Sequence, residues 1–188
     1  HGQLLEQFVD SFAALPESLI LDFDATDDPV HGQQEGRFFH GYYRHYCFLP
    51  LYVFCGDQCL VSYLRPSNID GAKHSWAILA LLVKRLRRAW PDVSITLRGD
   101  SGFCRHKMLG WCERNEVNYI VGLAKNPRLN QLSQPWTDQA KSQFEAQQHK
   151  QRLFTELHYQ AGSWKRQRRV ILKAEHMSQG SNPRYVVT

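Results

Sequence analysis

The hydrophobic positions of residues 1–125 follow two periods, one of three to four residues and one of two. The first is typical of helices that bury one face, and the second is typical of strands that bury one side. Gly and Pro residues mark the turns between these segments. The pattern predicts helices over residues 1–14, 72–90 and 103–115. It predicts strands over residues 19–24, 38–54 with a bend near Pro50, 59–64, 93–97 and 119–123.

After the leading helix, the predicted order is β-β-β-α-β-α-β. Such an order indicates an α/β fold with a mixed sheet, in which an antiparallel meander is followed by right-handed βαβ crossovers. Asp70 is the predicted N-cap of the helix over residues 72–90. The apolar stripe expected on that helix consists of Trp76, Leu79, Ala80, Val83 and Leu86.

The amino-acid composition of the chain changes after residue 125. Residues 125–151 are polar and rich in Gln, which favours a partly helical connector. Strands are predicted over residues 153–159, 168–174 and 185–188. We therefore divide the chain into a leading helix (1–18), a core (19–125), and a connector with a β-rich insertion (126–188).

Charge is unevenly distributed between these parts. Residues 151–188 hold seven Lys and Arg against two acids, whereas residues 1–150 hold 16 of each. A neutral body with a basic end favours a polyanionic partner such as nucleic acid, although a well-solvated charged face has the same composition. The candidate contacts to a DNA backbone are Lys165, Arg166, Arg168 and Arg169.

The totals exclude several classes of protein. The five cysteines form no C-x-x-C pair, which argues against a zinc site and favours reduced thiols in a cytoplasmic protein. The longest apolar run, residues 77–83, is too short to cross a membrane. The chain of 188 residues starts without Met and ends inside an apolar run, so we expect it to be part of a longer protein.

The first candidate site lies at the end of the first predicted strand. An apolar run over residues 19–21 leads directly into Asp22, Asp24, Asp27 and Asp28. Residues two apart on a strand share a face, so Asp22 and Asp24 are predicted to point the same way. Clustered carboxylates repel one another, and either a divalent cation or solvent in a turn would offset that cost.

A second acid, Asp100, follows the strand over residues 93–97 in the motif R-G-D-S-G-F. Ligands in open α/β sheets bind at the carboxyl ends of strands. If this strand lies parallel beside the first, Asp24 and Asp100 meet although they are 76 positions apart. Two carboxylates in that arrangement are typical of a two-metal site for phosphoryl transfer.

Four motifs of the core resemble those of the bacterial insertion-sequence transposases of DDE domain group 1, in particular insertion sequence family 1380. These motifs are L-D-F-D-A-T-D-D-P-V-H-G-Q-Q-E-G, F-F-H-G-Y-Y-R-H-Y-C-F-L-P-L-Y-V-F-C-G-D, R-P-S-N-I-D-G and R-G-D-S-G-F. The similarity spans about residues 19–125. It implies a ribonuclease H-like catalytic core with three metal-binding acids.

By this resemblance, Asp24 and Asp100 are the first two catalytic acids, and Thr26 lies beside the first. The third acid of the family is a Glu on a later helix, in a Tyr-Arg-Glu-Lys-like context that residues 1–188 lack. Glu145, Glu156 and Glu175 have different surroundings. We therefore expect the third acid to lie beyond this chain, and the chain to be inactive alone.

The resemblance also implies the chemistry and the partners. Two Mg²⁺ ions, for which Mn²⁺ substitutes, would activate water against a phosphodiester at a transposon end, and the freed 3′-hydroxyl would then attack target DNA. A homodimer is expected on DNA, in the bacterial cytoplasm near the nucleoid. Asp22 is the rival of Asp24, and Asp22, Thr26 and His31 are candidates for an outer shell around the metal.

Several other residues have two readings. His31 and Glu35 could orient water or phosphate, or could be solvated loop residues. His40 and His45 lie five apart in one predicted strand, so they are expected to face opposite sides. Tyr42, Tyr43 and Tyr46 favour sheet packing over base stacking, and Trp164 suits either role.

Three other functions are compatible with parts of the sequence. A structure-selective nuclease of the same fold would share both acids but lack strand transfer. A non-catalytic DNA-binding domain would bind DNA without divalent metal. A sugar- or nucleotide-binding α/β protein would leave the basic end unexplained.

Overall fold

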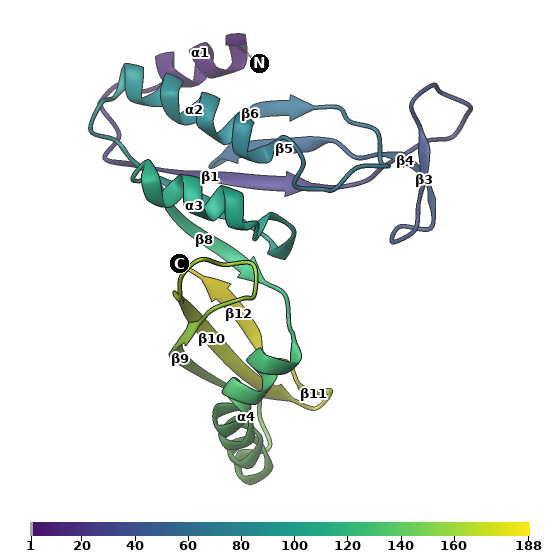
Figure 1. The fold of residues 1–188 in the computed structure, drawn as a ribbon, viewed down its shortest axis with the longest axis vertical. Coiled ribbons are helices and arrows are strands. Elements are labelled where there is room, and N and C mark those ends of the chain that lie inside the picture. Colours follow the sequence, from purple (N-terminus) through teal and green to yellow (C-terminus); the bar gives the residue numbers. More distant parts are fainter. Residues whose placement is uncertain (1) are drawn as a thin grey trace. The chain divides into compact units, whose positions relative to one another are not determined.

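The computed structural model describes residues 2–188, which form two compact units, residues 2–119 and 120–188 (Figure 1). His1, the first residue of the predicted leading helix, lies outside the described residues. The mixed α/β class predicted from the sequence is confirmed. None of the helices within residues 2–188 has both the length and the apolar character that a membrane span requires.

The main sheet of the first unit has the strand order β7 (Ser94–Gly99), β1 (Ser18–Ala25), β5 (Leu51–Cys55) and β6 (Gln58–Tyr63). β1 runs parallel to β7 and antiparallel to β5, and β6 returns antiparallel to β5. β1 buries Leu19, Leu21 and Phe23 on one face and exposes Asp24 on the other. This alternation anchors the strand, because burial of apolar surface stabilises the fold.

The helices of the first unit are α1 (Gly2–Asp10), α2 (Ser75–Ala89) and α3 (His106–Arg114). α1 buries Leu5 and Phe8 and ends four residues earlier than predicted. The ring of Phe8 packs edge-on against Trp90, with a centroid distance of 6.1 Å. This contact ties the leading helix to the residue that follows α2.

The predicted start of α2 is wrong by three residues. Asp70 is not its N-cap: the Asp70 carboxylate accepts a hydrogen bond of 2.8 Å from the backbone N–H of Ala72 and so closes a turn before the helix. His74, in the left-handed region with φ of 69°, precedes the first helical residue, Ser75. Three residues of the predicted apolar stripe, Leu79, Val83 and Leu86, are buried, and Leu82 joins them. Trp76 is instead exposed, and Ala80 is only half-buried.

The strand predicted over residues 38–54 breaks near Pro50, as expected, between β4 (His45–Phe48) and β5, but the part before Pro50 is not one strand. The chain reverses within it, and a separate three-stranded antiparallel sheet forms in the order β2 (Asp28–Pro29), β4 and β3 (Phe38–His40). The reversal is closed by Arg44, which has φ of 60° and donates its backbone N–H to the His40 carbonyl at 2.7 Å. The prediction that His40 and His45 face opposite sides is therefore wrong, because they are a cross-strand pair and share one face of the hairpin. Figure 1 shows this sheet beyond the carboxyl end of β1.

The second unit combines one long helix with antiparallel strands. α4 (Pro127–Gln147) occupies most of the predicted connector, and Asn126 caps it by accepting a 3.0 Å hydrogen bond from the N–H of Leu129. Its strands are the end of β8 (Asn118–Leu123), then β9 (Gln151–Tyr159), β10 (Arg168–Met177), β11 (Gly180–Ser181) and β12 (Arg184–Val187). β10 pairs with β9, β11 and β12, and β12 pairs with β8.

Candidate active site at the strand ends

The parallel pairing of β1 with β7 places Asp24 and Asp100 at neighbouring strand ends. Residues 18–23 pair in register with residues 94–99, and the last pair joins Phe23 to Gly99. Asp24 and Asp100 are the next residues along the two strands, and both are exposed. Within residues 2–188, no hydrogen bond or ion pair engages the Asp24 carboxylate, which leaves its oxygens available to a ligand.

Asp22, the rival of Asp24, has a partner. Both oxygens of its carboxylate accept from the Arg98 guanidinium, from Nε and from Nη2, the latter at 2.6 Å. The partner stands directly opposite Asp22 in the β1–β7 register. A bidentate pair of this kind satisfies the carboxylate, so Asp24 is the better candidate ligand.

The loop after β7 holds Asp100 in a defined turn. Its Oδ1 accepts a 2.8 Å hydrogen bond from the backbone N–H of Gly102, at the start of a short 3-10 helix (Ser101–Phe103). A Cβ at Gly102 would lie 2.9 Å from that same oxygen, and one at Gly99 would lie 3.0 Å from the Phe103 ring. Both glycines are therefore needed for the close packing of this turn.

The loop after β1 contributes a pair that the sequence did not indicate. The Asp27 carboxylate lies 2.7 Å from Nε2 of His45 on β4. Burial raises the pKa of the Tyr43 phenol, and the negative charges of Asp27 and Asp24 add to the rise. Tyr43 thus lies within electrostatic range of the candidate site. Thr26 is half-buried in this loop.

His31, predicted to lie in an outer shell around the metal, is exposed in the loop after β2. Within residues 2–188 it has no hydrogen bond or ion pair. Its structure therefore supports neither reading over the other, and the role of His31 stays a prediction.

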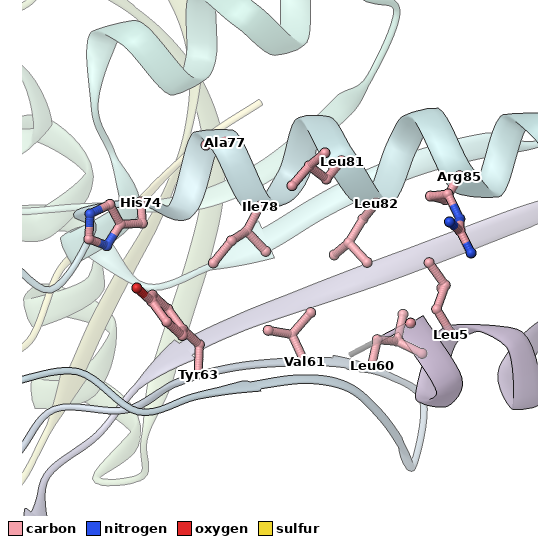
Figure 2. A pocket seen from close by; sticks show the side chains of 11 residues that line it. Leu5, Leu60, Val61, Tyr63, His74, Ala77, Ile78, Leu81, Leu82 and Arg85 are labelled. Atoms are coloured by element: carbon pink, nitrogen blue, oxygen red, sulfur yellow. The ribbon is translucent and has the colours of Figure 1, made fainter.

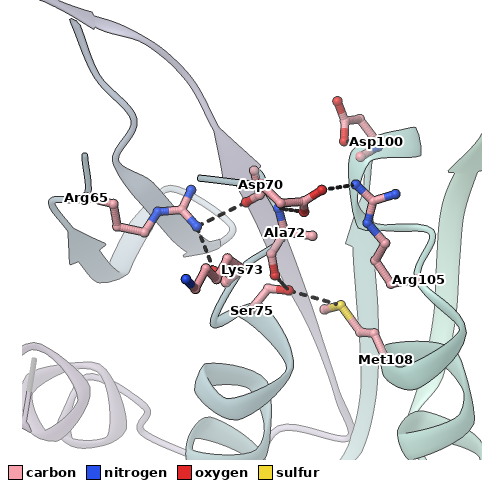
Figure 3. Close-up of polar contacts among 10 residues, drawn as sticks. Arg65, Asp70, Ala72, Lys73, Ser75, Asp100, Arg105 and Met108 are labelled. Atoms are coloured by element: carbon pink, nitrogen blue, oxygen red, sulfur yellow. Dashed lines mark hydrogen bonds and ion pairs between the residues drawn. The ribbon is translucent and has the colours of Figure 1, made fainter. Parts of the chain in front are cut away.

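A second missed pair joins the loop before α2 to the start of α3. The Asp70 carboxylate accepts a 2.6 Å hydrogen bond from Nη2 of Arg105 (Figure 3). Arg105 lies five positions after Asp100 in the sequence. Both side chains are about half-exposed. No sequence pattern indicates this pair, because Asp70 has the position of an ordinary helix cap.

Buried Arg65 holds the loop that carries Asp70. Its Nε donates to the Leu49 carbonyl at 2.9 Å, and its Nη1 donates to the carbonyls of Gly71 and Lys73 at 3.1 and 2.7 Å (Figure 3). The residue is 1% exposed, and burial lowers the pKa of its guanidinium. One side chain thus joins the loop, through the carbonyls of Gly71 and Lys73, to the carbonyl of Leu49.

The donor chemistry at the strand ends fits a hard divalent cation. Carboxylate oxygens are the ligands that Mg²⁺ prefers, and Asp24 and Asp100 supply them at adjacent ends. Across residues 2–188, no group of three or more His, Cys, Asp or Glu side chains is arranged to hold a metal. Asp24 and Asp100 are therefore two candidate ligands and do not by themselves form a complete metal site.

The four basic candidates lie in the second unit and differ in their surroundings. Lys165 and Arg166 are exposed. Arg168 is 8% exposed, and its guanidinium lies 4.7 Å from the centre of the Trp164 ring, which is itself buried. Arg169 donates to Glu156 at 2.8 Å. Trp164 therefore packs within the β9–β10 hairpin, and Arg168 and Arg169 both contact other side chains of the protein.

The first unit also has an apolar groove of about 480 Å³ between α1, β6 and α2 (Figure 2). Leu60, Ile78 and Leu81 are among its lining residues, with Tyr63 and His74 at one end. No acidic residue of the described chain lines it. The groove therefore lacks the ligands for metal-dependent chemistry.

Comparison with known families decides the identity of the chain. The sequence profile described as transposase DDE domain group 1 matches residues 1–188. The chain belongs to this family. No curated protein matches the sequence of this DDE domain.

A solved structure shares the fold of this DDE domain. It is the cryo-EM structure of the piggyBac transposase synaptic complex with hairpin DNA, with a TM-score of 0.50 and 12% sequence identity. The match covers 97% of this chain and 35% of that one. The chain therefore spans about a third of the length of the transposase that it resembles.

Proposed function

We propose that the chain is part of the catalytic core of a DNA transposase, which cleaves phosphodiesters at transposon ends and transfers the strand to target DNA. The observation that carries this proposal is the placement of Asp24 and Asp100 at adjacent strand ends in a chain of the DDE family. The β1–β7 pairing within a mixed sheet also supports a ribonuclease H-like core. Insertion sequence family 1380, a bacterial source and a cytoplasmic, nucleoid-associated location belong to this proposal.

Asp24 and Asp100 would hold Mg²⁺, or Mn²⁺ in its place, with two ions in the complete site. When bound, such ions lower the pKa of an attacking water and stabilise the leaving oxygen. The chain's own contribution is positional: the β1–β7 register sets the spacing of the two acids, and the turn closed by Gly102 orients Asp100. The pair of Asp22 with Arg98 keeps a competing carboxylate out of the ligand set.

The third carboxylate is proposed to lie outside residues 1–188. The three glutamates considered from the sequence already have cationic partners. Glu175 contacts three cations, Glu156 accepts from Arg169, and Glu145 lies 3.8 Å from Lys141. All three belong to the second unit. Their ion pairs support the expectation that another residue completes the site.

DNA is the proposed partner, both as transposon ends and as target. Lys165 and Arg166 are exposed and suited to phosphate contacts, and Arg169 would have to exchange Glu156 for phosphate. Binding by such a patch weakens steeply with salt because bound counterions are released. A homodimer assembled on DNA is part of the same proposal.

The metal assignment is tested by titrating the chain with Mn²⁺ under electron paramagnetic resonance. Asp24→Asn and Asp100→Asn should each abolish tight binding, since each replaces a ligand oxygen. Asn at position 100 can still accept the Gly102 hydrogen bond, so the turn is kept. Asp92→Asn is the matched control, because Asp92 is an exposed aspartate before the amino end of β7. Binding that survives both substitutions would remove the site.

The alternative of a structure-selective nuclease shares the same acids and is separated by the reaction product. With a longer chain that contains the third acid, a transposase joins a 3′-hydroxyl end to target DNA, whereas a nuclease only cleaves. Cleavage without joining in the presence of Mg²⁺ would favour the nuclease. DNA binding that needs no divalent ion, with no cleavage, would leave a non-catalytic domain.

A further inference from the structure

The outer face of the β3–β4 hairpin is aromatic where an antiparallel sheet normally meets water with polar side chains. Phe39 and Tyr46 are opposite each other in the pairing, with exposed fractions of 57% and 47%. Their ring centres lie 5.7 Å apart at an interplanar angle of 73°. Tyr42, in the turn, is 84% exposed. On the opposite face Cys47 is completely buried, but its partner Phe38 is 41% exposed. The Tyr42 ring contacts Tyr43, with ring centres 5.1 Å apart.

A cation accompanies these rings. The Arg37 guanidinium lies over the Tyr46 ring, 4.5 Å from its centre. Arg44 is exposed in the same turn as Tyr42, between β3 and β4. Rings combined with guanidinium groups are typical of surfaces that bind single-stranded nucleic acid, because bases stack on the rings and cations attract the backbone.

The hairpin is anchored to the candidate active site. Asp27, in the loop after β1, lies 2.7 Å from His45 on β4, and the backbone N–H of Val30 donates to the Tyr46 carbonyl at 3.0 Å. On the other strand, the Ser67 hydroxyl donates to the Phe38 carbonyl at 2.9 Å. The loops that follow β1 and β6 therefore both hold the hairpin next to the strand ends.

We propose that Phe39 and Tyr46, together with Tyr42 in the turn of the hairpin, here called the aromatic face, bind unpaired nucleobases of a DNA strand whose phosphodiester lies at Asp24 and Asp100. This inference rests on the proposed function. Stacking suits the site because every base has a π-face, so the contact tolerates any sequence.

The size of the aromatic face favours bases over a second copy of the chain. A stable subunit interface buries about 800 Å² on each partner. One aromatic side chain buries roughly 150–250 Å² when it is fully covered. Three rings that are already partly covered fall short of an interface of that size, but they match two or three stacked bases.

The test compares two DNAs with the 188-residue chain: a duplex with a single-stranded overhang carrying 2-aminopurine, and a blunt duplex of the same length. Wild-type chain should bind the overhang more tightly and change the 2-aminopurine fluorescence. Phe39→Ala and Tyr42→Ala should each weaken overhang binding about 5- to 150-fold, the range expected for one stacked base. Binding to the blunt duplex should not change.

The controls separate stacking from folding. Tyr42→Phe keeps a ring at an exposed turn position and should retain wild-type affinity, whereas Tyr42→Ala removes the ring without touching the sheet. Phe154→Ala removes an exposed ring of β9 in the other unit, 67% exposed, and should have no effect. Circular dichroism of each variant confirms the fold.

Three results would overturn the inference: equal loss on both DNAs, no binding of the overhang by the wild-type chain, or a concentration-dependent dimer that the same substitutions abolish. The last would make the aromatic face a self-association surface. The Mn²⁺ titration reports separately on the proposed function, because it depends on Asp24 and Asp100 and not on these rings.

Discussion

Asp22 and Arg98 face each other across the β1–β7 pairing and form a bidentate ion pair. The pair leaves Asp24 as the carboxylate of β1 that is open to a ligand. Asp22→Asn should therefore lower the free energy of unfolding by less than about 1 kcal/mol, as for other partly exposed pairs, and keep the metal site.

Asp24→Asn should instead lower the affinity of the chain for Mn²⁺. Loss of an outer partner of a metal ligand already costs about 10- to 100-fold in affinity, so loss of the ligand should cost at least as much. Urea unfolding and Mn²⁺ titration of both variants check the contrast. A larger loss of Mn²⁺ affinity in Asp22→Asn than in Asp24→Asn would reverse the assignment.

Substitution of Arg65, which lies outside the pair of candidate acids, should strongly lower the free energy of unfolding. Arg65→Met leaves the carbonyls of Leu49, Gly71 and Lys73 without their donor in a buried place. Each unsatisfied buried group costs about 1–3 kcal/mol, so we expect a loss of roughly 3 kcal/mol or more in urea unfolding. The free energy of unfolding of Arg65→Lys should lie between those of wild type and Arg65→Met. A single ammonium cannot reach all three carbonyls with the same geometry.

The matched control for Arg65 is Arg85→Met. Arg85 forms an exposed pair with Glu6 at 3.2 Å. That substitution should cost less than about 1 kcal/mol. A similar cost for both arginines would show that the buried hydrogen bonds of Arg65 contribute little.

We expect Glu175 to make the stability of the second unit depend on pH. Hydrogen bonds from Lys150, and then from Arg152 and Lys173, lower the pKa of Glu175 to about 2. A lowered pKa in the folded state means that the unfolded chain binds the proton first, so the stabilisation is present above the usual pKa near 4.5 and is lost as pH falls toward 2.

Glu175→Gln isolates this contribution. The variant should be less stable than wild type at pH 7, and the difference should shrink between about pH 4.5 and pH 2. Urea unfolding followed by circular dichroism at several pH values measures it. A difference that stays constant down to pH 2 would mean that the carboxylate's charge is not what the three cations stabilise.

The five cysteines form no disulfide, and differences in burial should make their thiols differ in reactivity. Burial, with a smaller contribution from Glu113, raises the pKa of Cys112 to about 12. Only the thiolate is alkylated, so native Cys112 should resist iodoacetamide at pH 8, whereas half-buried Cys59 reacts. Peptide mass spectrometry checks the order. In urea all five should react alike, and early labelling of native Cys112 would show that α3 opens readily.

The parts of the fold that could be predicted are those set by local patterns. The strand over residues 19–24 was predicted from its apolar run and the strand over residues 93–97 from its alternation, and the structure shows β1 and β7 there. The predicted positions of Asp24 and Asp100 follow from the ends of these two strands. The helix over residues 72–90 was found for its long apolar periodicity, though not its first turn.

What could not be predicted depends on contacts distant in sequence. The reversal at Arg44 splits a continuous aromatic run, and nothing in residue period distinguishes a bent hairpin from one long strand. Arg65 and Arg168 look like surface charges, yet both are buried by partners that the chain brings from elsewhere. The same holds for the pair of Asp70 with Arg105, which joins two loops 35 positions apart.

The parallel register of β1 and β7 has a consequence for how such chains can vary. The two acids are aligned by the pairing of Leu19 with Ile95 through Phe23 with Gly99, and not by the length of the chain between them. Insertions in the hairpin or before α2 would leave their alignment intact. Deletion of one residue inside β1 would instead turn Asp24 toward the core, because side chains alternate between faces. Length variation among homologues should therefore be confined to the loops, with both strands constant in length.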